Sequence, residues 1–450
     1  MRSTNRSTAA DETSVVSEAM STPPVEPTPT STEAAAHTAE STMAFREVMR
    51  DRPVRLLTMM QLFISTGVFL QAAVLGKQVF DITDRELDLG LLGLAEFLPS
   101  FLLVLVTGSV IDRFDRKKVA LTAFSLEICC SLALMFYARS NPTRVWPLFL
   151  IAVIFGVARA FSSPATRVMS PMVAPEGGFT RVIAIHSATW TTAIILGPAA
   201  SGFLYTIDPW VAYAVGAALI VFGAIALMQV KFRRAPQRPE AGDRPSLHSA
   251  LEGLRFIRRT PILLAAISLD LFAVLFGGAV ALLPAIAEKR LGVGDVAYGW
   301  LRAAGGIGAA VMAVFIAIKP FNRRVGPILL SVVAVFGAGT VVLGLTRTYV
   351  VAFIAMMVLS AADMVSVYIR STLVPLATPP SKQGRVTSVE NVFIGASNEL
   401  GAFESGLAAA ILGTATAVVL GGVATLVVVG VFAVVFPTLR RVDRFPEPAE

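Results

Sequence analysis

Charged residues are scarce in this 450-residue chain. They make up 15% of it, against about 25% in an average soluble domain. Hydrophobic residues make up 55%, and the mean hydropathy is +0.69. A water-soluble protein of this size would expose too much apolar surface to water. The composition therefore excludes a soluble enzyme, a secreted disulfide scaffold and a nucleic-acid-binding domain.

Cysteine and histidine are rare as well. Cys129 and Cys130 are adjacent within an apolar run, so they form no disulfide framework. The three histidines lie far apart, without the spacing of a metal site. No P-loop sequence, H-E-x-x-H or G-x-S-x-G occurs, which excludes ATP hydrolysis by a P-loop and disfavours a membrane protease or lipase. We predict no metal, no cofactor and no enzyme activity.

Long apolar runs begin near Val54 and alternate with short charged segments. Backbone polar groups find no water inside a bilayer, so these runs should be helices. They lack the period-two alternation of a membrane β-barrel. We predict an all-α integral membrane protein with twelve transmembrane helices. The predicted spans are 54–80, 88–111, 119–138, 145–170, 181–205, 209–230, 261–287, 298–319, 326–346, 349–375, 386–412 and 415–437.

Lys and Arg concentrate in the loops on one side of these spans, as at Arg116, Lys117 and Arg323. Positively charged loops stay in the cytoplasm, so both termini are predicted there, in a multi-pass protein of the cell inner membrane. The predicted division is a disordered cytoplasmic tail (1–45), a six-helix bundle (46–230), a cytoplasmic linker loop (231–259), a second six-helix bundle (260–440) and a cytoplasmic C-terminal tail (441–450).

An internal repeat supports the division into two bundles. When the sequence is shifted by 204 residues, Pro171 falls on Pro375 and Arg181 on Arg385. Two six-helix halves related by an axis along the membrane normal are the parallel-repeat architecture of many transporters. The repeat therefore predicts two pseudo-symmetric halves.

The loop after the second span, Gly108–Lys118, resembles the signature loop of the major facilitator superfamily, G-x-x-x-D-R-x-G-R-K. Asp115 stands where that pattern has glycine. The resemblance implies that Asp112 pairs with Arg167 and with the start of the eleventh span, near Gly384. The other interpretation is a generic basic loop. The residues of this predicted conformational-switch loop are Gly108, Asp112, Arg113, Arg116 and Arg167.

The fifth span contains Gly197, Pro198 and Gly202, which resemble the helix-five motif of the superfamily's antiporters. The motif favours export, although ordinary packing of small residues gives the same pattern. In the second half, 282–287 and 398–401 resemble the enterobactin-exporter-like branch, which holds drug and siderophore exporters.

Three ionisable residues lie near the middle of predicted spans: Arg159, Asp270 and Asp363. Such groups cost several kcal/mol in a membrane, so they indicate a function or a compensating partner. The resemblance implies that their helices line a central cavity. Arg159 and Asp363 are repeat-equivalent, so we expect them to face each other, with Asp270 as a second partner. A static salt bridge between the halves is the alternative.

Further polar residues occur within the spans. Glu96 and Glu399 are additional candidates for substrate binding or proton coupling, whereas Glu127 is expected to face a neighbouring helix. Lys77 and Arg302 lie near outer ends, where long side chains can reach the interface. A polar stripe on span eleven, at spacings of four and seven, is either a cavity wall or a hydrogen-bonded seam. Its residues are Thr387, Asn391, Asn398 and Ser405.

These features predict a secondary active transporter that works by alternating access. We expect it to export a small amphipathic compound, drug-like or siderophore-like, in exchange for protons. Its expected partners are that substrate, protons and the lipid bilayer; nucleic acid is not among them, and the chain is expected to be a monomer. The alternatives are an importer or lipid-handling member of the same fold, or a non-transporting receptor or channel.

Overall fold

The computed structural model describes residues 45–233 and 247–446, and the regular structure in these ranges is entirely helical. This confirms the all-α prediction for the described residues. The predicted N-terminal tail lies outside them, except for its last residue. Helices that precede residues 234–246 are called the N-terminal group below, and helices that follow them the C-terminal group.

The N-terminal group contains the first nine described helices. Their bounds are α2 (Phe45–Arg50), α3 (Arg52–Thr83), α4 (Glu86–Leu102), α5 (Val104–Arg113), α6 (Arg116–Arg139), α7 (Trp146–Arg167), α8 (Ser170–Val173), α9 (Phe179–Ile207) and α10 (Pro209–Gln229).

The C-terminal group follows the same pattern of long helices and short connections. Its elements are α11 (Leu247–Arg259), α12 (Pro261–Phe276), the 3₁₀ turn η1 (Ala279–Leu282), α13 (Leu283–Ala285), the π-helical turn η2 (Ile286–Arg290), α14 (Asp295–Ile318), α15 (Val325–Leu345), α16 (Tyr349–Leu376), α17 (Pro380–Leu412), α18 (Thr414–Val435) and α19 (Pro437–Arg440).

Helix starts follow local sequence signals. Asp115 caps α6, because its carboxylate accepts hydrogen bonds from the backbone N–H groups of Lys117 (2.8 Å) and Lys118 (3.1 Å). The residue that departs from the signature loop thus begins the next helix. Proline occupies the first turn of α10, α12 and α17, where its missing N–H costs no hydrogen bond.

Ten segments in the described ranges are long and apolar enough to cross a membrane. They include 261–290, which joins α12 to η2. Two predicted spans are not among them. The second is broken at Leu103, four residues after Pro99, so α4 and α5 are each short. The eleventh, α17, is 33 residues long, but five charged residues lower its hydropathy. These are Lys382, Arg385, Glu390, Glu399 and Glu404.

Within each group, neighbouring helices pack side by side. In the N-terminal group α3 packs on α9 and α10, α6 on α7 and α10, and α4 on α7. In the C-terminal group α14 packs on α16, α15 on α16 and α18, and α12 on α17 and α18. In both groups, helices that are not consecutive in the chain therefore pack against each other.

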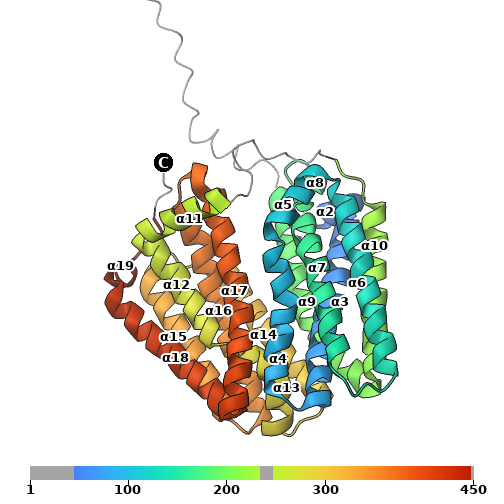
Figure 1. Ribbon diagram of the computed structural model, residues 1–450. Helices are drawn as coiled ribbons and strands as arrows, with labels where there is room; N and C mark the ends of the chain where they lie inside the picture. Colours follow the sequence, from blue (N-terminus) through green and yellow to red (C-terminus); the bar gives the residue numbers. More distant parts are fainter. Residues whose placement is uncertain (1–44, 234–246, 447–450) are drawn as a thin grey trace, which may run out of the picture. The chain divides into compact units, whose positions relative to one another are not determined.

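Two helix pairs form the main seams between the groups: α9 with α14, and α4 with α17 (Figure 1). Glycines allow both approaches. A Cβ at Gly202 of α9 would lie 2.5 Å from the Asp295 carbonyl oxygen, and one at Gly299 of α14 only 2.8 Å from the Gly202 Cα. On the other seam, a Cβ at Gly90 would lie 3.0 Å from the Ala402 carbonyl oxygen. The backbones therefore touch, with no room for side chains.

The two ends of the helices differ in charge. At the basic end, Lys117 donates hydrogen bonds to the carbonyls of Met228 (2.8 Å) and Val230 (2.9 Å), and Arg233 pairs with Asp51. At the opposite end, a buried apolar cluster takes residues from both groups, including Phe80 and Leu89 with Leu282 and Tyr298. An apolar core therefore joins the two groups at that end.

Candidate functional site

A buried ionic cluster lies inside the C-terminal group, where α12, α16 and α17 meet. Arg370 Nη2 is 2.9 Å from Asp270 Oδ1, and these side chains are only 5% and 7% exposed. The Ser366 hydroxyl donates a weak hydrogen bond to the same Oδ1 at 3.4 Å. Glu390 of α17 lies 3.8 Å from Arg370 Nη1. One guanidinium therefore faces two carboxylates at short range.

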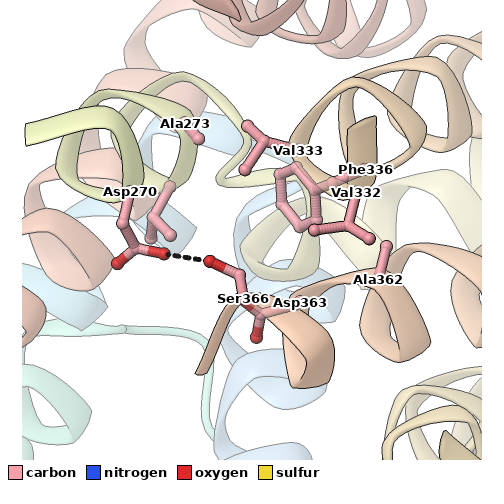
Figure 2. A pocket seen from close by; sticks show the side chains of 9 residues that line it. Asp270, Ala273, Val332, Val333, Phe336, Ala362, Asp363 and Ser366 are labelled. Atoms are coloured by element: carbon pink, nitrogen blue, oxygen red, sulfur yellow. Dashed lines mark hydrogen bonds between the residues drawn. The ribbon is translucent and has the colours of Figure 1, made fainter. Parts of the chain in front are cut away.

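Asp363 adds a third carboxylate to this cluster. It lies one turn before Ser366 on α16 and is close enough to Asp270 and Arg370 to interact with both electrostatically. Figure 2 shows a small pocket that both aspartates and Ser366 line. The remaining wall is apolar and includes Val333 and Phe336. Three carboxylates thus share one cation beside a pocket with mostly apolar walls.

A second ionic cluster lies where the two groups meet. Arg159 of α7 and Arg302 of α14 both interact electrostatically with Glu96 of α4 and Glu399 of α17. Glu399 reaches the α4 backbone, because a Cβ at Gly93 would lie 3.0 Å from its Oε2. All four charged side chains are partly exposed. This cluster therefore combines both groups and contains equal numbers of positive and negative side chains.

The structure separates residues that the sequence was expected to bring together. Asp270 pairs with Arg370, and Arg159 belongs to the cluster of Glu96 and Glu399 instead. The physical reason is packing: α7 lies on α4 and α6, whereas α12 lies on α17 and α18. Repeat equivalence matched Arg159 to Asp363 by position in the chain, but it did not give the neighbours of each helix.

Sequence reasoning missed the main cation of the first cluster and one of its acids. Arg370 lies seven residues after Asp363, which places both on one face of α16. That spacing was a usable signal. Glu390 gave a weaker one, because it is one of three acids in a moderately polar helix. Charges on one helix face can be read from spacing, whereas partners on other helices cannot.

The polar stripe of α17 divides along its length. Thr387, Asn391 and Asn398 are exposed, whereas Ser405 is buried against Gly278. The exposed part lies nearer the basic end of the helix. An exposed polar side chain within a membrane helix is expected to face water rather than lipid. The stripe therefore favours a wet cavity wall towards the basic end and tight packing at the opposite end.

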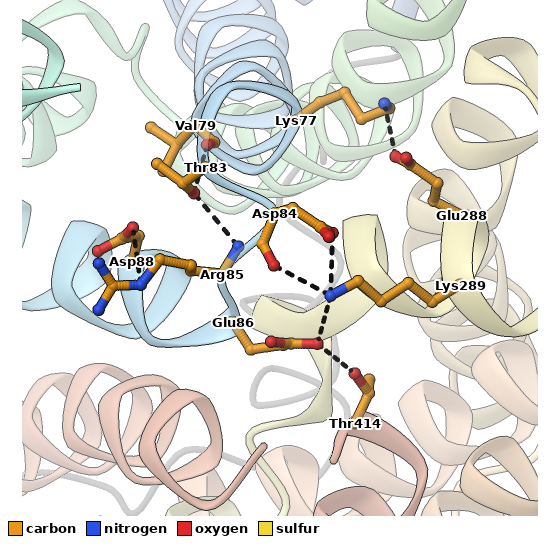
Figure 3. Close-up of polar contacts among 10 residues, drawn as sticks. All are labelled: Lys77, Val79, Thr83, Asp84, Arg85, Glu86, Asp88, Glu288, Lys289 and Thr414. Carbon is orange, nitrogen blue, oxygen red and sulfur yellow. Dashed lines mark hydrogen bonds and ion pairs between the residues drawn. The ribbon is translucent and has the colours of Figure 1, made fainter. Parts of the chain in front are cut away.

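Two ion-pair networks at the opposite end bridge the groups (Figure 3). Lys77 of α3 pairs with Asp81 on its own helix and lies 3.3 Å from Glu288 and 3.5 Å from Asp295 of the C-terminal group. Lys77 is only 8% exposed, so its side chain is part of this seam. It does not reach out to the interface, which was the expectation from the sequence. The Tyr298 hydroxyl reinforces the contact by donating to the Ala73 carbonyl at 3.0 Å.

The second network centres on Lys289 of the π-helical turn. Its Nζ lies 2.9 Å from both Asp84 Oδ1 and Glu86 Oε1 of the N-terminal group. The Thr414 hydroxyl also donates to Glu86 Oε1 at 2.9 Å. Together, the two networks connect α3 and α4 to η2, α14 and α18.

The predicted conformational-switch loop forms the end of α5 and the start of α6. Arg113 and Arg167 are exposed, and Arg116 and Gly108 are partly exposed. The side chain of Asp112 lies outside the described part of the structure, so its pairing stays a prediction. Arg385, at the expected contact point, pairs with Glu252 of α11.

The helix-five motif lies at the contacts of α9. Gly197 packs on α3, where a Cβ would lie 2.9 Å from the Thr66 carbonyl oxygen, and Pro198 is buried inside the helix. Gly202 packs on α14, as described above. The motif thus brings α9 into contact with both groups.

Comparisons with known proteins add independent findings. A family model described as the Major Facilitator Superfamily matches residues 55–402. Macrolide efflux protein A of Streptococcus pyogenes is 25% identical over 44% of this chain, and the match spans about half of that relative's length (49%). The multidrug efflux pump Tap of Mycolicibacterium fortuitum is 25% identical over 88% of this chain and 98% of its own. The enterobactin exporter EntS of Escherichia coli is 22% identical over 90% and 94%.

Solved structures resemble the fold at low identity. A POT family transporter in complex with a thioalcohol-conjugated peptide gives a TM-score of 0.69 at 11% identity, covering 86% of this chain and 96% of its own. The D-xylose-proton symporter gives 0.64 at 13% identity, covering 85% and 96%. These likenesses concern the fold alone.

Proposed function

Because the chain belongs to the major facilitator superfamily, we propose that it is a secondary transporter that exports a small amphipathic compound in exchange for protons. Membership confirms the resemblance seen in the loop after Gly108. The family and the relatives are transporters, so the chain is a multi-pass membrane transporter rather than an enzyme. Substrate, direction and coupling ion belong to the proposal.

The observation that carries the proposal is the sharing of Arg370 among Asp270, Asp363 and Glu390. A buried carboxylate without its own cation favours the neutral, protonated form. A single guanidinium can compensate one carboxylate fully at a time. Movement of Arg370 between these acids would therefore change where a proton is held. The pocket beside two of the acids has room for about one water molecule, so water could exchange protons with them there.

We propose twelve spans in two six-helix halves, with α4 and α5 together forming the second span and α17 the eleventh. The halves then correspond to the N-terminal and C-terminal groups. The N-terminal half then spans 46–230 and the C-terminal half 260–440, with tails at 1–45 and 441–450; α11 belongs to the linker, 231–259. The basic end faces the cytoplasm by the positive-inside rule, in the cell inner membrane.

In this orientation, the glycine seams and both ion-pair networks close the outer end. The exposed polar part of α17 then lies towards the cytoplasmic end. Alternating access requires the reverse arrangement in a second state, with the seams of α9–α14 and α4–α17 opened. The charges of the second cluster lie beside the α4–α17 seam, where opening would change their separation.

The names of the relatives suggest the first compounds to test, namely a macrolide and enterobactin. Everted membrane vesicles that contain the full chain should accumulate erythromycin or enterobactin when a proton gradient, acidic inside, is imposed. Accumulation in right-side-out vesicles would instead identify an importer. Ion conduction without substrate, at rates above those of a carrier, would identify a channel.

The coupling residues are tested in proteoliposomes that contain a pH-sensitive dye. Asp270→Asn and Asp363→Asn should abolish uphill transport and the associated proton movement, while downhill exchange persists. Asp208→Asn is the matched control, because Asp208 caps α10 outside both clusters and asparagine also caps helices. Wild-type proton movement in both cluster variants would show that Arg370 and its acids are purely structural.

A further inference from the structure

Glu127 is a buried acid that neither ionic cluster uses. It lies about midway along α6 and is 1% exposed. The Ser162 hydroxyl of α7 donates to its Oε1 at 2.7 Å. Its Oε2 is also buried and has no hydrogen-bond partner among the described residues. The side chain therefore has a single hydrogen bond inside the N-terminal group.

This arrangement suits a neutral carboxylic acid better than a carboxylate. An ionised carboxylate accepts hydrogen bonds at both oxygens, and leaving a buried charge unsatisfied costs far more than leaving a neutral group unsatisfied. The other acids show the contrast. Glu86 has Lys289 and Thr414, and Asp270 has Arg370 and Ser366. Glu127 has one neutral donor.

The surroundings of Glu127 contain one cation that can change its protonation. Arg159 lies one turn before Ser162 on α7 and interacts electrostatically with Glu127. On α6 itself, Cys130 is close enough to Glu127 to interact with it electrostatically. Of the other helices that pack on α6, α10 contributes Tyr213, whose hydroxyl donates to Gln78, and α5 carries Arg113 at its exposed end.

Arg159 also interacts with Glu96 and Glu399, alongside Arg302. The charge of Arg159 therefore acts on three acids, two in the second cluster and one in the core of the N-terminal group. When Glu96 or Glu399 becomes neutral, more of that charge is available to stabilise an anion at Glu127. Binding of a proton in the second cluster thus favours release of a proton from Glu127.

We propose that Glu127 is a second proton-binding site, filled in the state described here and linked to Glu96 and Glu399 through Arg159. Its ligand is a proton, held on the carboxyl group while Ser162 fixes the orientation. The proposal deepens the proposed function, because it adds a proton site to the exporter. Its primary test needs neither a substrate nor transport.

The test is infrared difference spectroscopy of the full-length protein in liposomes, recorded between buffers of stepped pH. A C=O band of a protonated carboxylic acid should be present and should be lost in Glu127→Gln, which mimics the neutral acid and should fold. Ser162→Ala keeps the acid but removes the hydrogen bond to its carbonyl oxygen, so the band should move to higher frequency. A band unchanged in both variants would overturn the proposal.

The link through Arg159 is tested with the same band. In Arg159→Gln the acid band should persist to higher pH, because the stabilising cation is gone. In Glu96→Gln the band should disappear at lower pH. With the Glu96 charge removed, the positive charge of Arg159 stabilises the Glu127 anion more strongly. Identical titration in wild type and both variants would contradict the link. If neither erythromycin nor enterobactin is transported, these spectra can still be interpreted. The proposed export function and the proposed proton site at Glu127 can therefore be disproved independently.

Discussion

The molecule contains ion pairs of two kinds, which differ in burial and in what they join. The pair of Arg370 and Asp270 is 5% and 7% exposed and lies within the C-terminal group. The contacts of Lys77 and Lys289 with Glu288 and Asp84 join the two groups, and those acids are 53% and 76% exposed. The Arg370–Asp270 pair is thus much more buried than these two contacts between the groups.

This difference indicates which pairs can break during a transport cycle. Breaking a buried pair strands a charge in a medium of low dielectric constant, which costs several kcal/mol. An exposed pair exchanges its partner for water at a cost of about 0–1 kcal/mol. The contacts that Glu288 and Asp84 make between the groups are therefore suited to opening and closing. The buried cluster is suited to keeping charge, and its own rearrangement needs a proton or a substrate.

The largest effect is expected for Arg370→Ala, which strands Asp270 and leaves Asp363 and Glu390 without their shared cation. Removal of one partner of a buried pair costs about 3–5 kcal/mol. We expect a clear fall in the apparent unfolding temperature in detergent and loss of proton-driven export. Arg347→Ala is the control, because Arg347 is exposed in a loop. Equal unfolding temperatures for the two variants would remove the distinction between buried and exposed charges.

A second effect is expected where backbones touch between the groups. A Cβ at Gly202 would lie 2.5 Å from the Asp295 carbonyl oxygen, so Gly202→Ala should prevent full closure of the α9–α14 seam. Overpacking of this kind costs about 1–3 kcal/mol. We expect spin labels on opposite sides of the outer end to move apart, measured by double electron–electron resonance.

The control for this seam is Gly430→Ala in α18, where a Cβ has open space. Both variants replace a helical glycine by alanine, so helix propensity changes equally. An unchanged distance distribution in Gly202→Ala would mean that the seam yields without opening. Closure would then depend on the ion pairs and the apolar core rather than on glycine packing.

Much of this fold could be predicted from the sequence because the apolar runs are long and frequent. The long helices of the described ranges fall within or close to the predicted spans, whereas α11 lies in the predicted linker. The two spans that fail a simple length and hydropathy criterion contain the features that matter most for contacts between the groups. One is broken at Leu103, four residues after Pro99, and five charges lie along the other.

The candidate site was less predictable, for a geometric reason. Asp270 and Asp363 were recognised as acids within spans, but Asp270 pairs with Arg370 instead of Arg159. Pairing across helices depends on which helices are neighbours and on their rotation, and a single sequence specifies neither. The networks of Lys77 and Lys289 were missed for the same reason, since their partners lie about 200 residues away in the chain.

The smallest effect is expected for Glu288→Gln, which removes one exposed acid from the Lys77 network. Lys77 keeps Asp81 and Asp295, so no charge is stranded. An exposed pair of this type contributes about 0.2–1 kcal/mol, which corresponds to a shift of roughly fivefold at most in the ratio of closed to open outer ends. The shift should be visible by double electron–electron resonance at low ionic strength and should vanish at about 1 M salt, where the screening length is near 3 Å.

Arg85→Gln is the control, because Arg85 pairs with Asp88 in its own group and should leave the ratio unchanged. A shift as large as that of Gly202→Ala, or one that resists salt, would mean that the pair behaves as a buried one, and exposure would then not be what separates the two kinds of ion pair.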